Sequence, residues 1–200
     1  MSHAFKPVKS TTHPFLQAEI HYDPHPEQPD LVCTITYNSR SRYVLGTKTA
    51  DADRDAEIAR RVRDGEYVGM PVWAYVHGGS TIRAAYQNPF GCPWDSGRSG
   101  WAYMTKADLR KHFGIKRVTK RVRAAALRVM EEDVKLFCAY LNSECYGFVI
   151  RNTDTGEAMD SCWGYYGEDH VRDAAMSALK QMEGITPCQM ELQLTEGETA

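Results

Sequence analysis

The stretch VWAYVHGGSTIRAAY, residues 72–86, decides the fold, because two strand-forming runs meet there at a pair of glycines. Residues 72–77 and 80–86 are rich in the β-branched and aromatic side chains that strands favour. Gly78 and Gly79 provide the backbone freedom that a tight reversal of the chain requires. The stretch therefore predicts a β-hairpin, and with it an antiparallel sheet.

A second hairpin is predicted further along the chain. Residues 146–152 and 157–163 are its two strands, and residues 154–156 (Asp-Thr-Gly) form its turn. Gly156 can take the positive φ that such a turn needs. We expect further strands or strand ends at residues 15–22, 31–37, 43–47, 101–104 and 188–194.

The predicted helices form a separate group. Residues 51–64 and 118–141 carry apolar side chains along one side, and Thr105 with Asp108 has the form of a capping box that opens a helix over 105–112. The last helix, which ends at Gly184, has apolar residues at helical spacing: Val171, Ala174, Ala175, Ala178, Leu179 and Met182. Strands in hairpins and helices in their own cluster predict an α+β fold, an antiparallel sheet with about four helices packed on it.

The length of 200 residues suits one domain. We expect a flexible N-terminus over residues 1–14, a single α+β domain over 15–194 and a flexible tail over 195–200. The net charge of −2 argues against a highly acidic nucleic-acid mimic and against a generally basic nucleic-acid binder. No apolar run could cross a bilayer and residues 1–12 do not resemble a signal peptide, so we expect a cytoplasmic protein with no membrane partner. The sequence indicates no cofactor and leaves the oligomeric state open.

The six cysteines have wide, irregular spacings and include no CxxC pair, which excludes zinc-ribbon and thioredoxin-like sites: Cys33, Cys92, Cys138, Cys145, Cys162 and Cys188. In a reducing cytosol most of them are expected to be small buried hydrophobes. His13, His21 and His25 are close in sequence but lack the further ligands of a tetrahedral metal site, so no metal is expected.

Residues 88–100 (NPFGCPWDSGRSG) are unusually apolar for a loop, and we expect them to fold back onto the body of the protein. Cys92 lies in this loop with Asp95 beside it, and His77 ends a neighbouring strand. A Cys–His–Asp set is chemically sufficient for acyl transfer, because the imidazole takes the thiol proton and the acid holds the imidazole. Cys162 offers a second version, with His170 as its partner. The alternative, which we favour for both, is a thiol packed beneath aromatic side chains.

Residues 105–123 resemble a helix–turn–helix at first sight. Arg110 stands where that motif has a small residue, and Lys120 where it has an apolar one. The basic cluster could still bind phosphates, or it could be a solvated helix face whose charges pair with Glu131, Glu132 and Asp133. The cluster is Lys111, Lys116, Arg117, Lys120, Arg121 and Arg123.

Residues 43–166 resemble a family of uncharacterised accessory proteins encoded by bacteriophages, plasmids and integrative conjugative elements. The most specific strings are CPWDSG at 92–97 and DSCWG at 160–164. The resemblance also rests on four other strings: RYVLG at 42–46, PVWAYVH at 71–77, GIKR at 114–117 and YGF at 146–148. The resemblance implies a mobile-element product acting in the bacterial cytosol, and it implies no reaction.

These observations favour a non-enzymatic accessory protein that binds and modulates a host or element macromolecule, for example to counter a host defence. The residues expected to bind are Trp94, Asp95, Ser96, Trp101, Trp163, Lys116, Arg117, Lys120 and Arg121. We expect the loops that carry Trp94 and Trp163 to meet on one end of a shared sheet. The alternatives are a cysteine-dependent hydrolase or transferase that uses Cys92 or Cys162, and nucleic-acid binding through residues 111–128.

Overall fold

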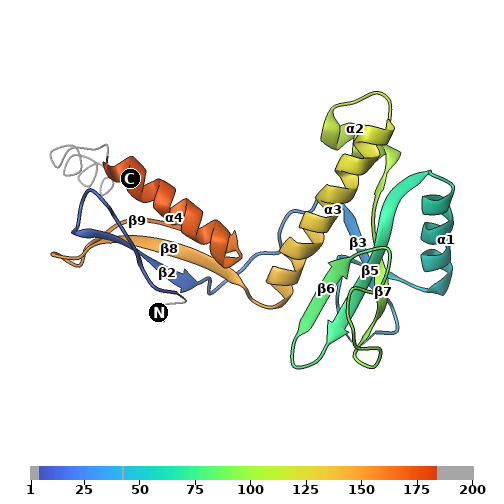
Figure 1. Cartoon of the computed structure of the whole chain (residues 1–200), viewed down its shortest axis with the longest axis horizontal. Helices are drawn as coiled ribbons and strands as arrows, with labels where there is room; N and C mark the ends of the chain where they lie inside the picture. The colour runs from blue at the N-terminus through green and yellow to red at the C-terminus, as the bar shows by residue number, and fades with distance from the viewer. Residues whose placement is uncertain (1–4, 42, 184–200) are drawn as a thin grey trace. The chain divides into compact units, whose positions relative to one another are not determined.

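The computed structural model describes residues 5–41 and 43–183, and the chain divides into two compact units (Figure 1). Unit 2 is the contiguous stretch 28–143, and unit 1 combines the residues up to 27 with those from 144 onward. Each unit has its own cluster of buried apolar side chains. Sequence analysis expects one domain over 15–194. The structure distinguishes two compact units, and in each unit the sheet packs against helix residues of that same unit.

Unit 1 is a four-stranded antiparallel sheet in the order β1-β2-β8-β9, followed in the chain by helix α4. Its elements are β1 (Val8–Lys9), β2 (Leu16–Tyr22), β8 (Cys145–Asn152), β9 (Ala158–Tyr166) and α4 (Glu168–Glu183). Val171, Ala175 and Leu179 of α4 are buried in one cluster with Ile20 and Phe148 of the sheet. The helical spacing seen in the sequence thus marks the face that α4 packs onto the strands.

Unit 2 is a five-stranded sheet in the order β4-β3-β7-β5-β6. Its strands are β3 (Thr34–Asn38), β4 (Lys48–Ala50), β5 (Tyr67–Val76), β6 (Ser80–Ala84) and β7 (Ser96–Thr105). All pairs are antiparallel except β3 with β4. Its helices are α1 (Ala52–Arg63), α2 (Lys106–Phe113) and α3 (Lys120–Leu141).

Helices α1 and α3 cover opposite faces of the unit 2 sheet (Figure 1). A Cβ at Gly69 would lie 3.0 Å from a methyl group of Val62, so this position of β5 faces α1. The adjacent Val68 belongs to the buried cluster that contains Met130 and Phe137 of α3. Neighbouring strand residues point to opposite faces, so the sheet is the middle layer of three.

The α+β class and the principal elements follow the sequence-based expectation. Val76 pairs with Ser80 across the first hairpin, and Gly156 has φ of +76° in the turn of the second. The capping box is present as well: Thr105 Oγ1 accepts from the Asp108 N–H at 3.2 Å, and the Asp108 carboxylate accepts from the Thr105 N–H at 2.8 Å. No helix in the described part of the chain is long and apolar enough to cross a membrane.

Three local expectations differ from the structure. The strand expected at 43–47 lies at 48–50, after a loop. Part of the segment expected to be flexible forms β1, which pairs with β2, and the Phe5 ring lies 4.9 Å from that of Tyr146. Strand β7 begins at Ser96 rather than at residue 101, because β5 continues to pair with it as far as Tyr75. The strand expected at 188–194 and the tail at 195–200 lie outside the described residues.

Candidate functional site

The connection between β6 and β7, residues 85–95, is named here the Trp94 loop. It was expected to pack onto the body, and for Trp94 this is wrong, because its side chain is 92% exposed. The Ser96 hydroxyl donates to the Cys92 carbonyl and accepts from Asn88 Nδ2 at 2.9 Å. These bonds close a tight turn around residues 93–95. Trp94 stands on the outside of that turn, where no neighbouring element covers it.

The structure brings together the three side chains proposed for thiol chemistry. His77 Nδ1 lies 3.2 Å from Asp95 Oδ2, and Cys92 Sγ lies 3.5 Å from the same oxygen. His77 directly follows β5, and its place is set by Val76, the last residue of that strand, whose N–H donates to the Asp95 carbonyl at 2.9 Å. The cluster therefore forms where β5 runs beside the end of the Trp94 loop.

The order of the three groups differs from that of a thiol triad. A triad places the imidazole between thiol and acid, so that the imidazole can take the thiol proton. Here the Asp95 carboxylate lies between Cys92 and His77. The arrangement suits a hydrogen-bonded turn better than an activated nucleophile.

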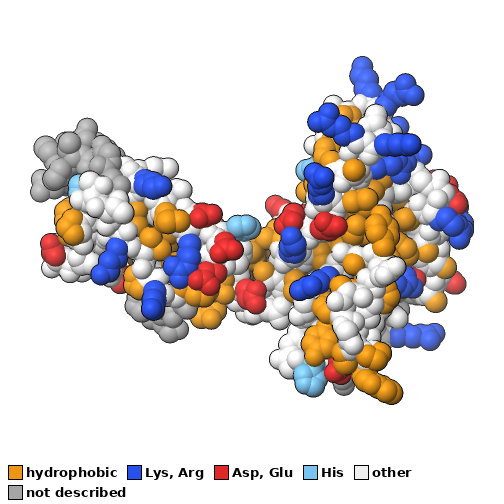
Figure 2. All heavy atoms as spheres, in the orientation of Figure 1, with side chains coloured by type: hydrophobic (Ala, Val, Ile, Leu, Met, Phe, Trp, Pro, Cys, Tyr) orange, Lys and Arg blue, Asp and Glu red, His pale blue; other side chains and the backbone are white. Residues whose placement is uncertain are grey.

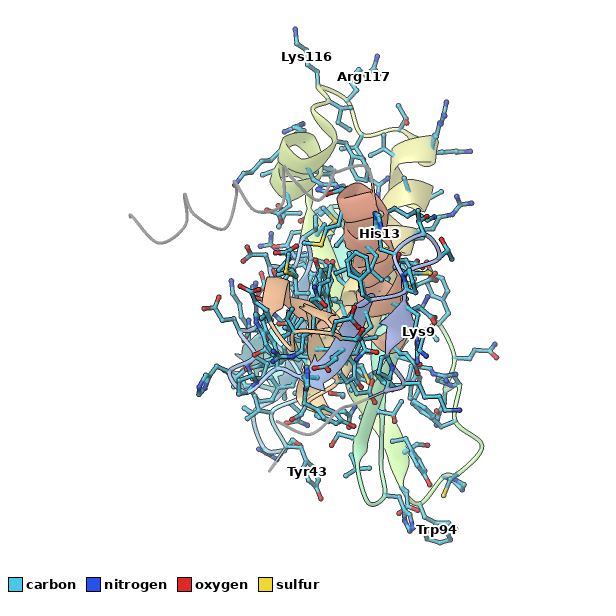
Figure 3. The ribbon with its side chains drawn as sticks, turned by 90° about the vertical axis from the view of Figure 1, so that its left-hand side faces the viewer. Lys9, His13, Tyr43, Trp94, Lys116 and Arg117 are labelled. Atoms are coloured by element: carbon cyan, nitrogen blue, oxygen red, sulfur yellow. The ribbon has the colours of Figure 1, made fainter. Side chains whose placement is uncertain are left out.

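A hollow of about 360 Å³ opens beside Trp94. Tyr43 and Arg40 from the β3–β4 loop line it, as does Arg98 of β7, while Leu45 and Ala74 provide apolar surface. Figure 3 shows Tyr43 and Trp94 at the same end of the chain's unit 2, projecting from separate loops. We name Trp94 and this hollow together the Trp94 surface.

The hollow exists because β3 diverges from β7. These strands pair only at Thr34 with Tyr103 and at Ile35 with Ala102, and β3 then turns to pair with β4. Arg98, beyond the divergence, donates to the Asp55 carboxylate at 2.6 Å. That bond fixes one wall of the hollow against α1.

The other tryptophans expected to bind are half-buried. Arg98 lies over the Trp101 ring at 5.6 Å, within the unit 2 sheet. Trp163 lies against the backbone of Gly147, where a Cβ would come within 2.1 Å of its ring. Trp163 is on β9 of one sheet and Trp94 precedes β7 of the other, so the expectation that the two loops share a sheet is wrong.

The thiols differ widely in exposure. Cys33 and Cys145 are buried as expected, Cys92 and Cys138 are half-buried, and Cys162 is exposed. Burial is the largest cause that raises the pKa of Cys145 to about 11, and the Asp23 carboxylate adds to it. Burial also raises the pKa of Cys33, with a further contribution from Asp133.

Cys162 does not have the partner that the sequence suggested. Its sulfur accepts a hydrogen bond from the Tyr165 hydroxyl at 3.3 Å, and no contact with His170 is seen. That hydrogen bond is the largest cause that raises the pKa of Tyr165 to about 12. An exposed thiol bonded to a phenol lacks the general base that nucleophilic catalysis requires.

The basic residues lie at the other end of unit 2. Lys116, Arg117, Lys120 and Arg121 are all exposed, and Figure 3 shows Lys116 and Arg117 pointing away from the fold at the end opposite Trp94. The helix–turn–helix resemblance is wrong, because six residues, 114–119, connect α2 to α3 where the motif has three or four. Helix α3 is also long and packs Met130 and Phe137 into the core.

Sequence reasoning missed Arg40 and Arg98, and quoted Tyr43 only within the family resemblance. No local pattern marks these residues, because the divergence of β3 from β7 alone brings them beside Trp94. Within residues 5–41 and 43–183, no group of three His, Cys, Asp or Glu side chains could hold a metal ion. In comparisons with protein-family models, curated proteins and solved structures, nothing matches this chain.

Proposed function

We propose that this chain is a non-enzymatic accessory protein of a mobile genetic element, and that it modulates a host or element protein by binding it through the Trp94 surface. The observation that carries the proposal is the 92% exposure of Trp94. A large aromatic side chain held in water by a closed turn gains stability only when a partner covers it.

The surroundings of Trp94 support a protein partner. Interfaces are enriched in Trp, Tyr and Arg, and their binding energy concentrates in a few such anchors. Tyr43, Arg40 and Arg98 line the hollow next to Trp94. Its volume of about 360 Å³ suits one or two side chains of a partner, held between aromatic and guanidinium groups.

The cysteine-dependent enzyme is less well supported. The carboxylate of Asp95 separates the Cys92 sulfur from His77, and Cys162 contacts a phenol in place of an imidazole. Ser96 is occupied in closing the turn. The contacts of Asp95 and Ser96 stiffen the loop that presents Trp94, so these two residues serve a binding surface.

The test compares Trp94→Ala with Tyr86→Ala as a matched control. Tyr86 is 67% exposed at the start of the same loop and does not line the hollow. The two variants and the wild type are used to capture proteins from a bacterial host lysate, and the captured protein is then titrated by calorimetry. Loss of a central Trp anchor should weaken binding by about 2 kcal/mol or more, which is about 30-fold in Kd.

We expect Tyr86→Ala to retain full affinity and Cys92→Ala to retain most of it. A captured protein that binds Trp94→Ala as tightly as the wild type would exclude the Trp94 surface. Turnover of any substrate that disappears in Cys92→Ala, while the fold persists, would favour the enzyme instead.

A further inference from the structure

The end of unit 2 formed by α2, the start of α3 and their connection is strongly basic, and we name it the basic end. Residues 105–123 contain eight Lys and Arg and a single carboxylate, Asp108, although the whole chain has a net charge of −2. Figure 2 shows these cations gathered over α2 and α3. The exposed members are Lys106, Arg110, Lys111, Lys116, Arg117, Lys120 and Arg121.

The connection between the helices is anchored, so the cations are held in place. Phe113 and Val118 pack against the buried cluster of unit 2, and the connection starts at Gly114 in the left-handed region, φ +62°. Lys116 and Arg117 stand between those two anchors and point outward (Figure 3). A held array of charges loses less conformational entropy on binding than a free chain would.

These cations are not neutralised within the fold. None of the seven exposed cations forms an ion pair with a described residue, although the sequence suggested Glu131, Glu132 and Asp133 as partners. Glu132 pairs with Lys135, and Asp133 accepts from the Cys33 N–H at 2.7 Å. Ten residues of helix, about 15 Å, separate Arg121 from Glu131.

Arg123 differs from the others and has a structural role. It is half-buried and donates from Nη2 to the Gly65 carbonyl at 2.7 Å, at the end of α1. The first turn of α3 contains no acidic residue, although acidic side chains stabilise helix N-termini. Of the eight cations at this end, Arg123 therefore contributes to the fold through its hydrogen bond to Gly65, and the seven exposed ones form no comparable ion pair with a described residue.

We propose that the basic end binds the phosphate backbone of double-stranded nucleic acid, without reading its sequence. The cations on this projecting end can neutralise phosphates, which are spaced regularly along a duplex, and the release of counterions from the duplex then drives binding. The described part of this end exposes no Phe, Tyr or Trp on which unpaired bases could stack, which disfavours single strands. It likewise lacks the aromatic anchors of a protein interface.

The experiment measures fluorescence polarisation of a labelled 30-base-pair DNA duplex of random sequence with the full chain, over a range of NaCl concentrations. Lys116→Glu/Arg117→Glu is compared with Lys48→Glu/Lys180→Glu, which changes the net charge equally at exposed sites elsewhere. We expect Lys116→Glu/Arg117→Glu to bind the duplex at least about tenfold more weakly than the wild type in low salt. Its slope of log K against log salt should be smaller by about two. Thermal melts check that both variants fold.

Several results would overturn the proposal. They are absence of duplex binding at 50 mM salt, equal weakening in the two variants, and tighter binding of single-stranded DNA or of poly-glutamate than of the duplex. A duplex RNA of the same length, run in parallel, separates a shared phosphate site from a preference for DNA. Trp94→Ala should bind the duplex like the wild type, because Trp94 lies at the opposite end of unit 2. A negative result with DNA therefore overturns the basic end alone, and the proposal for the Trp94 surface is judged by its own experiment.

Discussion

At the scale of single residues, the neighbours of a side chain decide its role more than its type does. Trp94 and Trp163 each follow a Pro or a Cys within a short string rich in Asp, Ser and Gly, and the sequence treats them alike. Trp163 covers the backbone of Gly147 and is half-buried, whereas a turn closed by Ser96 leaves Trp94 exposed. The difference in exposure follows from their places in the fold: Trp163 lies within β9 and packs on its neighbour β8, whereas Trp94 lies in the loop before β7.

The same reasoning predicts an order of thiol reactivity. Iodoacetamide at neutral pH should label exposed Cys162 first, half-buried Cys92 later, and Cys33 and Cys145 last. The pKa of Cys145, about 11 in place of 9.0, lowers its thiolate population about a hundredfold at a given pH. Mass spectrometry of digests after timed labelling measures the order.

In denaturant the described thiols should all react at similar rates, which is the control. Labelling of Cys145 as fast as Cys162 in the folded protein would contradict the packing of β8. A rate for Cys92 above that of Cys162 would point back to an activated thiol.

At the scale of elements, strand β7 organises unit 2. It pairs with β5 over nearly its whole length, while β3 meets it at two positions only. The β3–β7 pairing ends at Thr36. There the Thr36 hydroxyl, and not a backbone carbonyl of β3, accepts the hydrogen bond from the Trp101 N–H at 2.9 Å. The backbone of β3 therefore passes very close to β7 at Gly100.

Two glycines of β7 test this close approach. A Cβ at Gly100 would lie 2.1 Å from the Thr36 carbonyl oxygen, whereas a Cβ at Gly97 would meet nothing within 4 Å. Gly100→Ala should lower the free energy of unfolding by about 1–3 kcal/mol, as overpacking does. Gly97→Ala, in the same strand, should stay within about 0.5 kcal/mol of the wild type.

Urea unfolding followed by tryptophan fluorescence measures both values. Equal stability of the two variants would mean that the backbone of β3 does not pass this close to β7 at Gly100.

At the scale of the whole molecule, unit 2 is an uninterrupted stretch between two parts of unit 1. All five strands of its sheet, and α1, α2 and α3, come from residues 28–143. The two parts of unit 1 join in one sheet, because Tyr22 pairs with Tyr146 and the Asp23 N–H donates to the Cys145 carbonyl at 2.9 Å.

We therefore predict that residues 28–143 fold when expressed alone. Their buried cluster is complete, so heating should give one cooperative transition with native-like circular dichroism. Residues 5–27 joined to 144–183 by a short Gly-Ser linker serve as the companion, since the end of β2 lies beside the start of β8. A fragment 28–143 that melts without cooperativity would show that its core depends on unit 1.

The sequence by itself determined those elements of this protein whose signals are local. The hairpin at 72–86, the capping box of Thr105 and Asp108 and the helical spacing of α4 depend on residues a few positions apart, and the structure confirms each. Only the tertiary structure decided that there are two cores, that Asp95 lies between Cys92 and His77, and that the cations of the basic end form no ion pair with a described residue. These features depend on which distant strands pair and where they diverge, and no local pattern encodes that choice.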